Sequence, residues 1–166
     1  LLQYGLEKLS RDSREAGIDG ILATDLTPEE SGPLSTTLRA HEIDLIFLVA
    51  PTTTDARLRM IADCATGFIY AVSRAGVTGA RADLSAEAER LVKRVRHSSD
   101  LPVAVGFGIS TADQVAETWR YADAAVVGSA IVAEIERWSE SEDIVQRVGK
   151  FARGLIPERV SMSNTS

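Results

Sequence analysis

Two segments in the last third of the chain combine apolar runs with glycines in a pattern that suits anion binding. They span residues 103–110 and 124–129, and each has a buried β run, a glycine turn and a serine able to start a helix. Because glycine has no Cβ, Gly106, Gly108 and Gly128 leave room for a ligand to approach the backbone. Backbone N–H groups at a helix N-terminus favour an anion such as phosphate. The pattern predicts a phosphate site, and the simpler alternative is that these glycines only form tight turns.

Strand-like and helix-like patterns alternate along the chain, which indicates a parallel sheet covered by helices. Five strands are predicted, at residues 18–24, 44–49, 67–72, 102–105 and 124–127. Helices are predicted at residues 6–16, 33–41, 56–64, 86–97, 111–121, from 129 onward and at 142–154, with a long loop over 73–85. An open doubly wound sheet can use five strands, but candidate ligand loops follow nearly every strand here, which favours a barrel. The predicted fold class is α/β: a partial (β/α)8 TIM barrel with about five of eight βα units over 1–157, followed by a polar tail over 158–166.

Composition limits the partners that the chain can have. With 45% hydrophobic residues and a formal net charge of −6, the 166-residue chain is typical of one globular domain and is not expected to bind nucleic acid. No apolar run is long enough to span a bilayer, so neither a membrane partner nor a membrane location is expected. The single cysteine and the absence of a signal-peptide pattern favour the cytoplasm. The first residue is not Met, which suggests a piece of something longer.

Few side chains offer metal or acid–base chemistry. His41 and His97 fall at predicted helix C-termini, and Cys64 is interpreted as a half-buried filler. No group of His, Cys, Asp or Glu has metal-ligand spacing, so no metal site is expected. The basic residues between Arg90 and Arg96 are interpreted as a solvated helix face. Asp25, at a predicted strand end, is the only carboxylate well placed for chemistry.

Several motifs, taken in order, resemble those of the tryptophan synthase alpha subunit family. They are Leu-Gln-Tyr-Gly (2–5), Asp-Leu-Thr-Pro-Glu-Glu (25–30), Ile-Phe-Leu-Val-Ala-Pro (46–51), Ser-Arg-Ala-Gly-Val-Thr-Gly-Ala (73–80), Pro-Val-Ala-Val-Gly-Phe-Gly-Ile-Ser (102–110) and Val-Gly-Ser-Ala-Ile-Val (127–132). The resemblance implies a (β/α)8 barrel that cleaves indole-3-glycerol phosphate into indole and glyceraldehyde 3-phosphate by a retro-aldol reaction. It places this chain from the third helix through the eighth βα unit. Thr27 departs from a common family proline. Other phosphate-binding barrels share glycine-rich final loops but lack the 73–79 motif.

The resemblance also assigns site residues. The substrate phosphate would be held by Gly79, Phe107, Gly108, Gly128 and Ser129, and the pocket around the indole would be lined by Leu22, Leu48, Tyr70 and Thr78. Each pocket residue has a plainer alternative. Leu22 and Leu48 suit a barrel core, Tyr70 suits a core aromatic, and Thr78 suits a turn.

The family's catalytic Glu and Asp belong to units that would precede Leu1, so no catalytic residue is expected in this chain. The isolated chain is therefore expected to be an inactive part of a lyase in tryptophan biosynthesis. The implied partner is a beta subunit carrying pyridoxal phosphate, contacted through the Leu1–Tyr4 end and the 25–28 loop in an alpha2beta2 tetramer. This chain itself is expected to bind no cofactor. The alternative is a non-catalytic phosphate-binding or interaction module that binds a beta subunit.

Overall fold

Five parallel strands form one sheet, and they lie in the sheet in the same order as in the sequence. The computed structural model describes residues 3–72, 81–106 and 108–157, with side chains left out for 81–85. The strands are β1 (Gly20–Leu22), β2 (Asp44–Val49), β3 (Ile69–Val72), β4 (Val103–Gly106) and β5 (Ala124–Val126). Each pairs with the next in parallel. This sequential order without a reversal is the order of a (β/α)8 barrel, so the predicted fold class is confirmed as a half-barrel.

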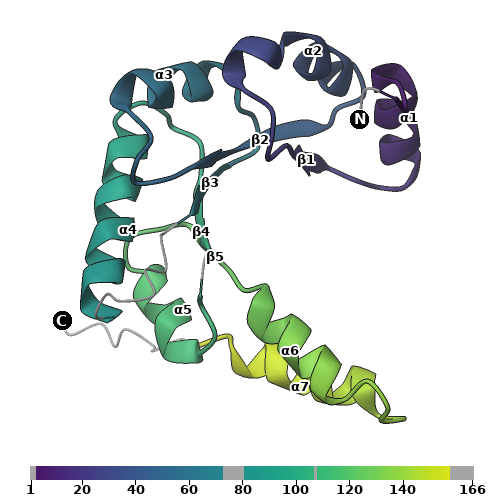
Figure 1. Ribbon diagram of the computed structural model, residues 1–166, viewed down its shortest axis with the longest axis vertical. Coiled ribbons are helices and arrows are strands. Elements are labelled where there is room, and N and C mark those ends of the chain that lie inside the picture. Colours follow the sequence, from purple (N-terminus) through teal and green to yellow (C-terminus); the bar gives the residue numbers. More distant parts are fainter. Residues whose placement is uncertain (1–2, 73–80, 107, 158–166) are drawn as a thin grey trace, which may run out of the picture.

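Helices cover one face of the sheet and leave the other face open (Figure 1). They are α1 (Leu6–Glu15), α2 (Gly32–Ala40), α3 (Asp55–Cys64), α4 (Arg81–Arg96), α5 (Ala112–Thr118), α6 (Ser129–Arg137) and α7 (Ile144–Gly154), with a 3-10 turn at Pro28–Glu30. Helices α6 and α7 form a hairpin that projects away from the sheet (Figure 1), and neither contains a buried residue. None of the helices in the described part of the chain is long and apolar enough to cross a membrane.

The core lies between the sheet and the helices that cover it. Alternate residues of β2, including Leu45, Phe47 and Val49, point to this side and are at most 2% exposed. Helix residues such as Leu38 and Leu91 pack against them. Since successive strand residues point to opposite faces, the intervening positions must line the open, concave face.

Local structure differs from the sequence predictions at several helix starts. Helix α4 begins at Arg81, whereas residues 81–85 were predicted to be loop. Helix α5 is capped by Thr111 rather than Ser110, because Thr111 and Gln114 form a reciprocal capping box. At the 3-10 turn, Thr27 is the N-cap residue but forms no side-chain cap, and its hydroxyl donates to the Glu30 carboxylate at 2.9 Å. At Thr27 and at Thr111, a side chain three residues further along the chain is the hydrogen-bond partner.

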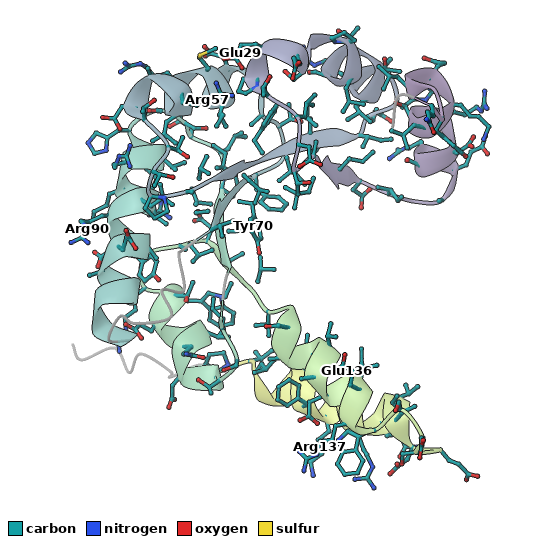
Figure 2. The ribbon with its side chains drawn as sticks, in the orientation of Figure 1. Glu29, Arg57, Tyr70, Arg90, Glu136 and Arg137 are labelled. Atoms are coloured by element: carbon teal, nitrogen blue, oxygen red, sulfur yellow. The ribbon has the colours of Figure 1, made fainter. Side chains whose placement is uncertain are left out.

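Arg94 corrects the interpretation of residues 90–96 as only a solvated face. Its guanidinium donates to the Asp55 carboxylate at 2.7 and 2.9 Å and to the Pro51 carbonyl at 3.1 Å. A further bond reaches the Thr53 carbonyl at 2.5 Å. Arg94 therefore ties α4 to the loop that positions α3, whereas Arg90 points outward from α4 (Figure 2).

Candidate functional site

The concave face of the sheet brings together three of the four residues predicted for the indole pocket. Leu22 pairs with Ile46 across β1 and β2, and Leu48 pairs with Tyr70 across β2 and β3. Leu22, Leu48 and Tyr70 therefore project from three consecutive strands on one face. Leu22 is 41% exposed, while Leu48 and Tyr70 are half-buried. The apolar, accessible lining suits a planar aromatic ligand better than a sealed core.

Tyr70 crosses the face toward the phosphate-side turns and packs on a glycine. A Cβ built at Gly106 would lie 2.7 Å from the Tyr70 Cζ and closer still to its hydroxyl oxygen. Figure 2 shows Tyr70 projecting from β3 to the open side of the sheet, away from α4. Partial burial raises the pKa of the Tyr70 hydroxyl above its usual value of 10.0, so this group is neutral and can donate a hydrogen bond. Gly106 is thus required for the position of this ring.

The two glycine turns emerge at the same edge of the sheet. Gly106 pairs with Val126 at the carboxyl ends of β4 and β5, and Gly108 and Gly128 each follow two residues later. Gly108 has φ +67°, a conformation that favours glycine. No atom of the described residues lies within 4 Å of a Cβ built at Gly108 or Gly128. The described part of the chain therefore leaves space beside both turns, as a ligand would require.

Helix α6 starts at this edge without a side-chain cap. Gly128 is its N-cap, and its carbonyl accepts from the N–H groups of Ile131 and Val132. Ser129 is the first residue of the nine-residue helix and is exposed. Unpaired N–H groups in a first helical turn, aligned with the helix dipole, attract an anion. Thr78, Gly79 and Phe107, which the sequence assigns to the same site, lie outside the described residues.

Among the five described strands, the concave face carries one carboxylate, Asp44, which lies at the amino end of β2 and so at the opposite end of the sheet from the glycine turns. The residues on this face are Gly20, Leu22, Asp44, Ile46, Leu48, Tyr70, Val72, Ala104, Gly106, Ala124 and Val126. Asp25 is exposed in the loop after β1. Glu29 pairs with Arg57 at 2.8 Å on the outer surface, where both are labelled in Figure 2. Backbone N–H bonding, with the Arg57 charge as a smaller contribution, lowers the pKa of the Glu29 carboxyl, which suits a structural anion rather than a general acid.

The remaining polar groups have structural contacts. His41 caps α2 and lies 3.0 Å from the Glu7 carboxylate, and His97 follows α4, where its Nδ1 contacts the Lys93 carbonyl at 2.7 Å. Cys64 is half-buried, as the sequence predicts. Within the described ranges, no three His, Cys, Asp or Glu side chains gather as a metal site.

Comparison with known proteins agrees with the fold. A half-barrel of parallel strands in sequential order belongs to the (β/α)8 class of folds. A family model described as tryptophan synthase alpha chain matches residues 1–157. The chain belongs to the tryptophan synthase alpha chain family.

Individual relatives are similar over nearly all of this chain. The tryptophan synthase alpha chain of Roseiflexus sp. (strain RS-1) is 49% identical over 154 residues, which cover 93% of this chain and 59% of that protein. The alpha chain of Caulobacter vibrioides is 48% identical over 96% of this chain and 60% of its own length. The chain thus spans about three fifths of the curated relatives it matches.

Solved structures give the same result. Tryptophan synthase subunit alpha from Legionella pneumophila str. Paris superposes with a TM-score of 0.80 at 32% identity, covering 92% of this chain and 56% of that one. A chain of the tryptophan synthase a2b2 complex from Pyrococcus furiosus gives a TM-score of 0.82 at 34% identity, covering 93% and 62%. The half-barrel therefore has the geometry of part of a full alpha-chain barrel.

The contact between Tyr70 and Gly106 was not among the predictions from the sequence. Its signal is present in the register, because an aromatic residue on one strand stands beside a run of small residues, Ala104 and Gly106, on the next. A large side chain beside small ones on one sheet face predicts that the ring lies over the small positions.

Proposed function

We propose that this chain supplies the phosphate-binding site (the phosphate grip) and part of the indole pocket of a lyase acting on indole-3-glycerol phosphate. The observation that carries the proposal is the shared edge at which Gly108 and Gly128 emerge beside the uncapped start of α6. The N–H groups there, with the Ser129 hydroxyl, would hold the substrate phosphate. Leu22, Leu48 and Tyr70 would contact the indole ring. Gly79, Phe107 and Thr78 are assigned to the same site by family resemblance.

The chemistry needs more than this face provides. Retro-aldol cleavage requires an acid to protonate the indole carbon and a base to accept the hydroxyl proton of the glycerol side chain. At the carboxyl ends of the described strands, the concave face offers neither a carboxylate nor a histidine, and its one carboxylate, Asp44, lies at the amino end of β2. Tyr70 is neutral and suited to orienting the substrate by hydrogen bonding. We infer that the catalytic Glu and Asp come from units outside this chain and that the isolated chain is inactive.

A beta subunit is the proposed protein partner. The Pyrococcus furiosus relative is described as part of an a2b2 complex, which supports such an assembly for the whole protein. The 25–28 loop, at the same strand ends as the candidate site, would form part of the contact. A pyridoxal phosphate group needs a lysine amine for its Schiff base. The three lysines of this chain, Lys8, Lys93 and Lys150, are all exposed on helices, so they do not fit this cofactor, and it is assigned to the partner. A cytoplasmic location is proposed with this assignment.

Titration with glycerol 3-phosphate tests the phosphate grip directly. We expect binding by the 166-residue chain in calorimetry and no turnover of indole-3-glycerol phosphate. Gly128→Val fills the space at the α6 start, where no atom of the described residues lies within 4 Å of a Cβ, so it should weaken binding at least tenfold while leaving the fold intact. Gly154→Ala is the matched control, since its Cβ also meets nothing and it lies at the far end of α7. Equal binding by both variants would refute the assigned site.

A second candidate function is a phosphate-binding module without catalysis. The specific observation in its favour is that the one carboxylate on the concave face of the described strands, Asp44, lies at the amino end of β2, away from the glycine turns. Binding of glycerol 3-phosphate and of a beta subunit, with no turnover even when the missing units are supplied, is the result expected of this module. Turnover by the isolated chain at the rate of a complete alpha chain would contradict both candidates.

A further inference from the structure

The hairpin of α6 and α7 connects the two glycine turns of the candidate phosphate site. Helix α6 begins directly after Gly128, at the end of the β5 turn. Leu155, which caps the C-terminus of α7, lines one cavity with Ser110, two residues after Gly108. Leu155 is buried, so this end of the hairpin is anchored by packing. The hairpin therefore has one base at each turn (Figure 1).

The direction of α6 is not fixed by burial in the core. None of its residues is buried, and Gly128 gives its first turn no side-chain cap. Among the described elements, α6 packs mainly against α7. A glycine at the N-cap is also a suitable pivot, because its backbone has wide conformational freedom. The direction of the N–H groups at the α6 start thus depends on how α6 is held against α7.

Trp138, the C-cap of α6, holds the far end of the hairpin together. Its indole Nε1 donates to the Glu134 carboxylate at 2.9 Å, one turn earlier, which fixes the ring against α6. The Arg147 guanidinium of α7 lies over this ring, 4.0 Å from its centroid. Arg137 of α6 also approaches the ring, at 5.0 Å. A guanidinium on an indole is attracted both as a cation and by stacking.

A carboxylate keeps Arg147 in the stacked position. Asp143, the N-cap of α7, accepts from the Arg147 Nε at 2.7 Å and from the Ser141 hydroxyl. Among the hydrogen bonds, ion pairs and cation–π contacts of the described residues, the one between Trp138 and Arg147 joins the end of α6 to α7. Since both bases of the hairpin are attached to the barrel, this contact closes a triangle that restrains the tilt of α6.

Tilting α6 would weaken the binding of an anion at its start. A helix of nine residues is about 14 Å long, so a shift of its far end by about 5 Å tilts it by about 20°. The N–H groups turn with the helix, and hydrogen bonds weaken as their angle falls below about 150°. A helix that samples several directions must also be ordered on binding, which lowers affinity further.

We propose that Trp138 is a positioning residue for the phosphate site. By stacking on Arg147, it sets the direction of α6 and so aims the N–H groups that follow Gly128 at the substrate phosphate. The inference rests on the proposed function, which supplies the phosphate. The direction of α6 can be measured without a ligand, so the two can fail separately.

Substitutions at Trp138 test the proposal in calorimetric titrations of the full chain with glycerol 3-phosphate. Trp138→Leu removes the stacking ring and should weaken binding by about tenfold. Trp138→Phe keeps a ring for Arg147 and should restore binding to within about threefold of the parent chain. Trp119→Leu is the matched control, because Trp119 caps the C-terminus of α5, a helix that buried Val115 and Thr118 hold in place. It should bind as the parent chain does.

The Arg147 side chain is tested in the same titrations. Arg147→Leu should weaken binding as much as Trp138→Leu does. The double variant should bind no more weakly than either single variant, because both substitutions remove one contact. Arg153→Leu removes the same charge from α7 at a side chain that lies beside Gly149, and it should leave binding unchanged. Equal losses in Arg147→Leu and Arg153→Leu would indicate a general charge effect and overturn the proposal.

Distances between spin labels report the direction of the hairpin without a ligand. In a chain carrying Cys64→Ser, labels would be attached at Glu140→Cys, in the turn between α6 and α7, and at Arg90→Cys on α4, two exposed positions. We expect one narrow distance distribution in this parent and with Trp138→Phe added. With Trp138→Leu added, the distribution should become clearly broader.

Both effects must appear together in a parent chain that binds glycerol 3-phosphate. Unchanged binding, or an unchanged distance distribution, in Trp138→Leu would overturn the proposal. A lower free energy of unfolding without these effects would indicate a merely structural role. Should Trp138→Leu fail to fold, Arg147→Leu carries the same two measurements. A parent chain that does not bind glycerol 3-phosphate would refute the proposed phosphate grip, and the distance distributions would then decide whether Trp138 sets the direction of α6.

Discussion

Adding a single methyl group at Gly106 tests whether the Tyr70 ring is held over β4 as the structure places it. In Gly106→Ala, the new Cβ would lie 2.7 Å from the Tyr70 Cζ, closer than that to its hydroxyl oxygen, and 3.1 Å from the Val126 Cβ. Real Cβ atoms essentially never approach other atoms within 3.0 Å, so the ring must move. Tyr70 and Gly106 are both part of the concave face, so the displaced ring would also change the proposed indole pocket.

The sign of the effect distinguishes this site from an ordinary glycine. Without a clash, replacing glycine by alanine stabilises a protein by about 0.4–1 kcal/mol, because the unfolded chain loses conformational freedom. Overpacking costs about 1–3 kcal/mol. We therefore expect Gly106→Ala to lower the free energy of unfolding by about 1–2 kcal/mol. Gly149→Ala, inside α7 and near only the flexible Arg153 side chain, should raise it by about 0.5–1 kcal/mol.

Urea unfolding of a double-mutant cycle measures the contact. Tyr70→Ala removes both clashing atoms, so adding Gly106→Ala to it should cost nothing, giving a coupling energy of at least about 1 kcal/mol. Tyr70→Phe removes only the hydroxyl and should rescue in part, because Cζ remains. The placement of the ring would be refuted if Gly106→Ala and Tyr70→Ala had additive effects on the free energy of unfolding. It would also be refuted if Gly106→Ala stabilised the protein as much as Gly149→Ala.

Three further substitutions test contacts outside the site. Arg94→Ala should lower the free energy of unfolding by about 1–2 kcal/mol, because it removes hydrogen bonds to one carboxylate and two carbonyls. The control Arg90→Ala, at a side chain that points outward, should change it by less than about 0.5 kcal/mol. Equal losses in the two variants would contradict the role of Arg94 in joining α4 to the loop before α3. Thr111→Ala removes the acceptor for the Gln114 N–H and should cost about 1 kcal/mol in the same urea assay. The Val103 N–H, and secondarily Arg96, hold the pKa of the Asp123 carboxyl below its usual value of 3.8. The stabilisation by Asp123 is therefore present above that value and disappears as the pH falls through the lowered folded-state pKa. In urea unfolding, the loss in free energy of unfolding caused by Asp123→Asn should therefore shrink on acidification between about pH 5 and pH 2. A loss that stays constant over this range would exclude the linkage.

Much of the element pattern could be predicted because it depends on local composition. The strand at Asp44–Val49 is a continuous apolar run between polar residues, and its predicted and observed bounds agree. Element ends were less predictable, because a helix begins where its N–H groups find an acceptor. Thr111 replaces Ser110 as the α5 cap since Gln114 completes the box from that position only. The early start of α4 at Arg81 likewise had no signal in residues 81–85 alone.

The sequence by itself determined the family, the alternation of strands and helices, and the glycines that a phosphate grip requires, because these follow from residue type and order along the chain. Only the tertiary structure decided which strand residues share the concave face. The side chains of one strand alternate between the two faces, and the register between strands determines which residues of neighbouring strands lie on the same face. It also placed the Tyr70 ring over Gly106 and joined Arg94 to the α3 loop, contacts between residues 36 to 43 positions apart. The open β1 and β5 edges are likewise a property of the assembled sheet, because an unpaired backbone group exists only once its neighbours have taken their places.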